Sequence, residues 1–66
     1  MRLTRIKLYR LQSGLRQIEL AQRADIARCR LSELECGWIE PRAEELKRLA
    51  RALGVSVENL AAEVRP

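Results

Sequence analysis

Apolar side chains recur along this chain at intervals of three and four residues, the spacing that places them on one face of an α-helix. Turn residues divide this pattern into five short segments. We expect helices over Arg2–Gln12, Arg16–Arg23, Ala27–Cys36, Ala43–Leu53 and Val57–Glu63. Five short helices with brief connections predict a compact all-α fold, built as one domain that spans residues 1–66.

The apolar stripes of these helices predict which side chains form the core. The stripes are Leu3, Ile6 and Leu11 in the first helix, Ala27, Leu31 and Leu34 in the third, and Leu46, Leu49, Ala50 and Leu53 in the fourth. The pair Ser13-Gly14 follows the first helix, and single glycines follow the third and fourth. Glycine commonly ends a helix because it adopts the left-handed backbone conformation without steric cost.

The second and third expected helices form a pair that is joined by a turn of three to four residues. Ala21 is small and lets the two helices cross closely, and Ile26 is placed to fill the turn. Leu31 and Leu34 anchor the second helix of the pair from below. This arrangement holds the outer face of that helix away from the body, where it can enter the major groove of DNA. A helical hairpin inside an ordinary bundle would have the same spacing.

The outer face of the third helix carries the candidate base-reading residues. A rotation of about 100° per residue places Cys29, Ser32, Glu33 and Cys36 opposite the buried leucines, with Arg28 and Arg30 on the flanks. Arg28 suits a two-bond contact with guanine, and Glu33 suits the amino group of cytosine. Glu33 would alternatively form a surface ion pair with Arg30.

The charge distribution supports a polyanionic partner. Residues 1–30 carry eight basic and two acidic side chains, a net charge of +6, whereas residues 31–66 carry a net charge of −2. Eleven of the thirteen basic residues are arginine, whose planar guanidinium pairs well with phosphate or a guanine edge. The alternative to a DNA-binding surface is an ordinary solvated basic surface.

Composition argues against an enzyme, a metal site and a membrane span. The chain has no histidine and no glycine-rich phosphate loop, so we expect neither catalysis nor a cofactor. Cys29 and Cys36 would lie about 10 Å apart on one helix, too far for a disulfide, and two cysteines without histidine do not make a zinc site. No apolar run is long enough to span a bilayer, and we expect a cytoplasmic, nucleoid-associated protein.

Two side chains allow a functional and a structural interpretation. Cys29 is either a redox-sensitive thiol in the DNA groove or a small side chain that contacts a thymine methyl group, and we favour the second because it has no resolving partner. Trp38 either covers the base of the core or lies at the surface near DNA or a dimer partner. We favour core cover because the chain has few aromatic residues.

The sequence as a whole resembles the phage-repressor-type (Cro-like, XRE) helix-turn-helix domain, from about Arg5 to Leu60. The residues that carry the resemblance are Gly14-Leu15, Gln17, Glu19-Leu20-Ala21, Leu31, Leu34-Glu35, Gly37, Pro41, Leu49-Ala50, Leu53-Gly54-Val55-Ser56 and Leu60. The resemblance implies a five-helix, lambda-repressor-like fold with the helix-turn-helix at helices two and three. It also implies binding to double-stranded DNA.

The resemblance further implies roles for individual positions. Arg16 and Gln17 match positions that bind backbone phosphates, and Arg42 matches one that approaches the backbone or minor groove. Base-facing positions of such domains match Ala27, Arg28, Cys29 and Glu33, with Arg30 near the flanking phosphates. Arg10 and Glu35 match a pair that forms a structural salt bridge.

Three residues depart from the family pattern. Arg16 and Ala27 stand where the family prefers a serine or threonine that caps a helix, and Asp25 replaces the common glycine of the turn. Loss of a side-chain cap costs about 1 kcal/mol. Aspartate tolerates a left-handed backbone better than most residues.

These features together predict a transcriptional regulator, a repressor that binds an inverted-repeat operator as a homodimer. A candidate seam between the subunits comprises Val57, Leu60, Ala61 and Val64. The alternative is a protein-interaction module, such as an antitoxin or adaptor with the same fold. No small-molecule ligand is implied.

Overall fold

The computed structural model describes residues 4–61. Its helices are α1 (Arg5–Gln12), α2 (Gln17–Ala24), α3 (Arg28–Cys36), α4 (Ala43–Leu53) and α5 (Val57–Ala61). No strand occurs within this range, and none of its helices is long and apolar enough to cross a bilayer. The all-α, five-helix prediction is confirmed, whereas the outer ends expected for the first and last helices lie outside the described residues.

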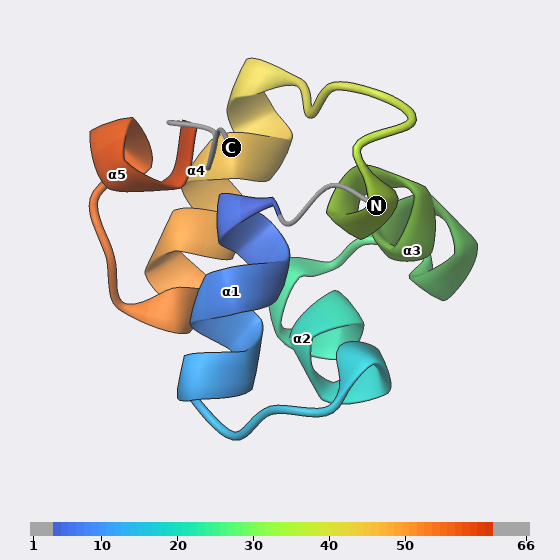
Figure 1. Ribbon diagram of the computed structural model, residues 1–66, viewed down its shortest axis with the longest axis horizontal. Coiled ribbons are helices and arrows are strands. Elements are labelled where there is room, and N and C mark those ends of the chain that lie inside the picture. Colours follow the sequence, from blue (N-terminus) through green and yellow to red (C-terminus); the bar gives the residue numbers. More distant parts are fainter. Residues whose placement is uncertain (1–3, 62–66) are drawn as a thin grey trace.

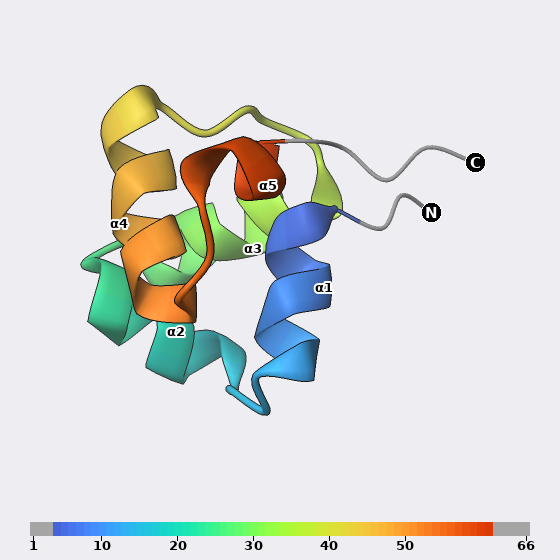
Figure 2. The same ribbon diagram turned by 90° about the vertical axis from the view of Figure 1, so that its left-hand side faces the viewer.

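The five helices pack around one core, with α3 and α5 on opposite sides of the molecule (Figure 1). In the view turned by 90°, α1 and α4 flank the centre and α2 closes the lower end (Figure 2). The loops that join α2 to α3 and α4 to α5 are short, so the helices of each pair lie close together. This arrangement leaves α3 at one edge, with a full side turned away from the body.

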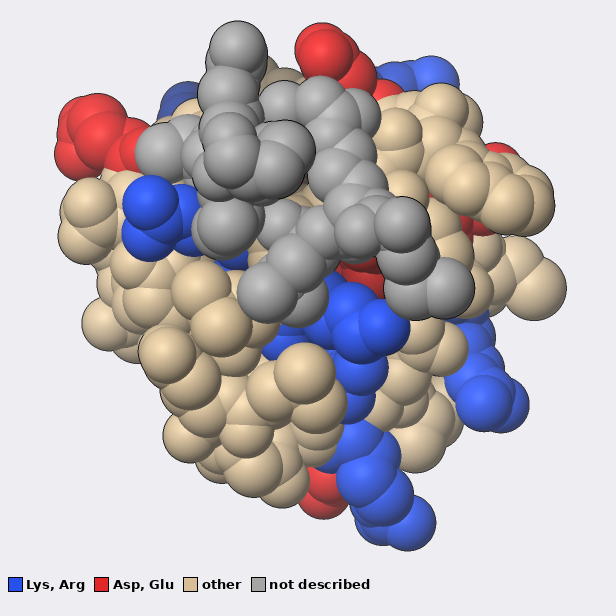
Figure 3. Space-filling view, viewed as in Figure 1, with Lys and Arg blue, Asp and Glu red and all other residues tan. Residues whose placement is uncertain are grey.

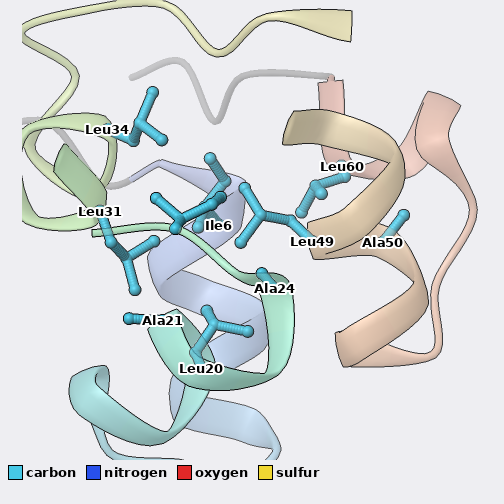
Figure 4. Packing of buried hydrophobic residues seen from close by; sticks show 10 residues of the cluster. Ile6, Leu20, Ala21, Ala24, Leu31, Leu34, Leu49, Ala50 and Leu60 are labelled. Atoms are coloured by element: carbon cyan, nitrogen blue, oxygen red, sulfur yellow. The ribbon is translucent and has the colours of Figure 1, made fainter. Parts of the chain in front are cut away.

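The core is made of aliphatic side chains that come from every helix (Figure 4). Leu20, Leu31, Leu34 and Leu49 are fully buried and join α2, α3 and α4. Ile6 from α1 and Leu60 from α5 complete the cluster. Burial of a leucine-sized side chain stabilises a fold by about 1.5–3 kcal/mol, so these few residues dominate the stability of a domain of this size.

Leu11 is exposed at 55%, and the prediction that it shares the buried stripe of the first helix is wrong. Five residues separate it from the buried Ile6, a rotation that places Leu11 about 140° away around α1. The short α1 therefore buries one side only, and Leu11 stands on the other.

The turn between α2 and α3 has a left-handed backbone at Asp25. Its φ of 55° makes it the one non-glycine residue with positive φ in residues 4–61. The backbone N–H groups of Asp25 and Ile26 close the end of α2 by donating to Gln22 O and Ala21 O, at 3.3 and 2.9 Å. Aspartate thus adopts the left-handed conformation that this turn requires.

In α2 and α4 the cap residue that precedes the helix is an arginine, whose side chain has no acceptor for capping. In each case a glutamate three residues later accepts the arginine's backbone N–H instead: Glu19 from Arg16 at 2.8 Å, and Glu45 from Arg42 at 2.8 Å. The Arg16 backbone contact and the nearby guanidinium also hold the pKa of Glu19 below its usual value. This half of a capping box replaces part of the missing serine or threonine cap.

Candidate nucleic-acid interface

The α2–turn–α3 unit has the geometry expected of a helix-turn-helix. Ala21 is 2% exposed and lies where the two helices meet, and Ile26 is buried in the turn. Leu31 and Leu34 are fully buried beneath α3. The opposite side of α3 is therefore free to face a ligand.

The residues on this outer side are mostly exposed. Arg28, Cys29, Glu33 and Cys36 are exposed, and Ser32 is half-buried. Together with Gln17 at the start of α2, Arg28, Cys29 and Ser32 line an open hollow of about 380 Å³. The start of α2 and the first half of α3 thus contribute to one shallow, open surface.

Ala27 lies outside the buried stripe in which the periodicity placed it. It is exposed, and its backbone is extended, with φ −61° and ψ 140°, because it precedes the first residue of α3. Helical periodicity therefore does not extend back to this position. Exposure at the helix start is compatible with a contact to DNA.

A largely buried network holds Gln17, one of the residues that line the hollow. Arg10 Nε and Nη2 donate to Glu35 Oε2 and Oε1 at 2.7 and 3.0 Å, and Arg10 Nη1 donates to Leu15 O at 3.0 Å. Gln17 Nε2 donates to Glu35 Oε1 at 3.3 Å. Thr4 Oγ1 adds a 2.9 Å bond to the Glu35 carbonyl oxygen. Glu35 thereby connects α3 to α1 and α2 and orients the Gln17 amide.

A second network joins α3 to α4. Arg30 Nε and Nη2 both donate to the Glu45 carboxylate, the latter to Oε1 at 2.8 Å, and the Arg42 backbone N–H donates to the same oxygen. The Arg30 contact, aided by the Arg42 N–H, lowers the pKa of Glu45 to about 2 against the opposing effect of burial. The alternative pairing of Arg30 with Glu33 is wrong, because the guanidinium turns toward α4.

Trp38 is 80% exposed, and the prediction that it covers the core is wrong. Its backbone N–H donates to Glu33 O at 3.1 Å just after the left-handed Gly37, which turns the chain away from the end of α3. The indole therefore lies on the surface beside the C-terminal end of α3.

One residue of the candidate dimer seam, Leu60, is buried in the structure. Leu60 is 3% exposed and packs in the core of its own protomer, so its side chain is not available to a partner. Val57 and Ala61 are exposed. Val64 lies outside the described residues.

Both cysteines are free and exposed. Residues 4–61 contain no cluster of three side chains suited to hold a metal ion. In the view of Figure 3, basic side chains form a stripe from the middle of the face to its lower edge, with an acidic side chain beside its lower end and others toward the top.

Sequence reasoning missed the contacts that Glu19 and Glu45 make at the starts of α2 and α4. Each glutamate lies three residues after a helix cap, the position from which a glutamate reaches back to the cap. That spacing was a usable local signal for the backbone contacts. The Arg30–Glu45 ion pair has no such signal, because it joins two helices across the α3–α4 loop.

Comparisons with known proteins agree with this geometry. The family model described as helix-turn-helix matches residues 6–60. Comparison of the sequence with curated proteins gives no match. Among solved structures, the N-terminal DNA-binding domain of SinR from Bacillus subtilis is 35% identical with a TM-score of 0.84, over 94% of this chain and 91% of that chain.

Two further solved structures are similar. A solution structure of the N-terminal DNA-binding domain of the master biofilm-regulator SinR from Bacillus subtilis has a TM-score of 0.76, with the same identity and coverage. A hypothetical transcription factor, NHTF from Neisseria, is 28% identical with a TM-score of 0.80, over 88% of this chain and 65% of that chain. From its helix pair and these similarities, the chain belongs to the XRE-type helix-turn-helix family of DNA-binding transcription regulators.

Proposed function

We propose that this protein is a repressor that binds an inverted-repeat DNA site as a homodimer, with α3 of each subunit in the major groove. The observation that carries the proposal is the outward face of α3, which is exposed and lies beside Gln17 at the start of α2. A helix held in this way by a helix-turn-helix unit fits the major groove of B-DNA.

The proposed contacts divide into phosphate and base contacts. Arg16, Gln17 and Arg42 bind the backbone and fix the position of the protein on the duplex. Arg28 reads guanine, Glu33 reads cytosine, and the small Ala27 and Cys29 side chains approach base edges or thymine methyl groups. Arg28 suits its role because it is exposed and forms no ion pair with a carboxylate in residues 4–61.

The small reading surface of one α3 supports the proposal of a two-fold dimer. One α3 reaches only a few base pairs, whereas two copies about 34 Å apart read both half-sites on one face of the duplex. Of the candidate seam, Val57 and Ala61 offer exposed side chains for the contact between subunits. Occupation of a site within a promoter by such a dimer would block transcription.

Selection of bound duplexes from a random DNA pool tests this proposal. We expect an inverted repeat with half-sites separated by about one helical turn, 10–10.5 base pairs. The substitution Arg28→Ala should relax the preference at one position of each half-site, worth about 1–3 kcal/mol of discrimination. Recovery of single, unpaired half-sites would contradict the dimer. An unchanged preference in the Arg28→Ala protein would contradict the contact.

A protein-interaction module is the second candidate function, and the exposure of Trp38 favours it. Tryptophan is enriched among the residues that dominate protein–protein binding. Under this alternative, Trp38→Ala abolishes capture of a stoichiometric protein partner and the chain does not shift duplex DNA at low salt. DNA binding that is unaffected by Trp38→Ala would reject it.

A further inference from the structure

We propose that Glu45 keeps the Arg30 guanidinium from binding DNA phosphates. Glu45 thereby acts as a specificity-determining positioning residue of the interface. The inference rests on the proposed function, because it concerns how α3 meets DNA. It assigns opposite roles to two arginines in the first turn of one helix. Arg28 is available to DNA, and Arg30 is already occupied.

The geometry of the ion pair carries the argument. Arg30 uses two N–H groups on the two oxygens of one carboxylate, the arrangement that an arginine also uses for phosphate. The Glu45 side chain is only 7% exposed, and a carboxylate that buried is costly to leave without a cationic partner. Release of Arg30 to a phosphate would leave the buried Glu45 carboxylate with the Arg42 N–H but without a cationic partner, which disfavours the exchange.

The position of Glu45 extends its influence to a second arginine. Its Oε1 also accepts the backbone N–H of Arg42, the residue that precedes α4 and has an exposed side chain. One buried carboxylate thus ties the flank of α3 to the start of α4. It fixes the distance between the groove-reading helix and the proposed backbone contact at Arg42.

The consequence is a difference in how the protein treats specific and non-specific DNA. Every free guanidinium near the interface strengthens binding to any duplex, because phosphates are present in all sequences. A guanidinium neutralised by a buried carboxylate contributes no such strength. Glu45 therefore lowers affinity for non-specific DNA and leaves discrimination to base contacts such as that of Arg28.

The test is the salt dependence of binding to a non-specific duplex, measured by fluorescence anisotropy for four proteins. In Glu45→Gln, the amide oxygen still accepts the Arg42 N–H but no longer neutralises Arg30. We expect the logarithmic salt slope to steepen by about 0.9, the increment for one additional phosphate contact. The ratio of specific to non-specific affinity should fall, because only non-specific contacts are gained.

Glu44→Gln is the matched control. Glu44 is the neighbouring residue, is exposed and has the same charge, so its substitution changes the net charge equally without release of Arg30. The double variant Arg30→Gln with Glu45→Gln keeps the wild-type net charge, and we expect it to return the slope to the wild-type value. A slope in Glu45→Gln equal to that in Glu44→Gln would overturn the inference.

The double variant also keeps the inference falsifiable if Glu45→Gln folds poorly. If Arg30 already contacts a phosphate in the wild type, the slope of the double variant becomes shallower than wild type by about 0.9, which overturns the inference. A salt slope of the double variant as steep as that of Glu45→Gln also overturns the inference, because the additional phosphate contact then does not come from Arg30. Failure of the wild type to bind any duplex at low salt would reject the proposed function itself, and the inference with it.

Discussion

Glu35 on α3 and Glu45 on α4 are both buried carboxylates held by two bonds from an arginine, but the arginines differ in their access to water. The Arg10 side chain is 12% exposed and lies beneath the helix-turn-helix, whereas the Arg30 side chain is 34% exposed and lies at its flank. Glu35 also receives bonds that tie in α1 and α2, whereas Glu45 connects only α3 and the start of α4. The same type of ion pair therefore lies in the interior of the domain at Glu35 and at the edge of the proposed DNA surface at Glu45.

The comparison teaches that an ion pair's place in the fold decides its effect. A carboxylate with several buried partners cannot be replaced without leaving those partners unsatisfied. A carboxylate whose cation is partly in water leaves a group that water can solvate again. We thus expect loss of Glu35 to affect stability most, and loss of Glu45 to affect DNA recognition most.

The largest expected effect is that of Glu35→Ala on stability. Removal of this carboxylate leaves the mostly buried Arg10 unpaired, and the Gln17 amide and α1 lose a common anchor. We expect a loss of about 3 kcal/mol in the free energy of unfolding, measured by urea titration with far-UV circular dichroism. Replacement of both Arg10 and Glu35 by apolar residues of similar size is the control, and it should cost less than Glu35→Ala.

The substitution Glu45→Ala is expected to cost less, about 2 kcal/mol in the same titration. Arg30 is partly hydrated already, so its charge regains water when the carboxylate is removed. A loss larger than that of Glu35→Ala would break the comparison, because it would place the Glu45 network among the main supports of the fold.

The pH dependence of the free energy of unfolding tests the ionic contact of Glu45 separately. The pKa of Glu45 is about 2 in the folded protein and has an ordinary value of 4.5, so folding favours the ionised form. Its contribution to stability is present above pH 4.5 and is lost as the pH falls toward 2. The difference in unfolding free energy between wild type and Glu45→Gln should shrink across this window. A difference that stays constant from pH 5 to 2 would contradict the ionic contact.

The smallest expected effect on stability is that of Gln17→Ala. Its bond to Glu35 is 3.3 Å long, so its loss should cost about 0.5–1 kcal/mol and leave the Arg10–Glu35 contact in place. Affinity should fall alike for all DNA sequences, because a phosphate contact carries no sequence information. Gel-shift titration with specific and unrelated duplexes checks this, and a loss confined to one sequence would count against the assignment.

Much of the fold could be predicted because its determinants are local. Leu31 and Leu34 lie three residues apart on one face of α3, and Ile26 follows a turn residue, so both signals are contained in short stretches of sequence. The exposure of Leu11 was not predicted, because its spacing of five residues from Ile6 was taken as close enough to helical periodicity. A rotation of about 100° per residue places it on a different side of α1. The exposure of Trp38 was not predicted, because a large apolar side chain favours burial. The left-handed Gly37 turns the chain away from the end of α3 and leaves the indole at the surface.

The candidate site could be predicted only in part, for a physical reason. The outer face of α3 follows from periodicity, since it is the side opposite the leucines. The partner of Arg30 does not follow, because the bend of the α3–α4 loop decides whether its guanidinium meets Glu33 on the same helix or Glu45 on the next. Such choices depend on three-dimensional packing and leave no spacing in the sequence.

The exposure of Trp38 has a practical consequence for work in solution. It is the only tryptophan of the chain, and its indole already lies in water in the folded protein. Intrinsic tryptophan emission will therefore change little when the protein unfolds, but it will respond when a duplex or a second subunit covers the end of α3. Tryptophan fluorescence is therefore suited to follow the association of this protein with a partner, and unsuited to follow its unfolding.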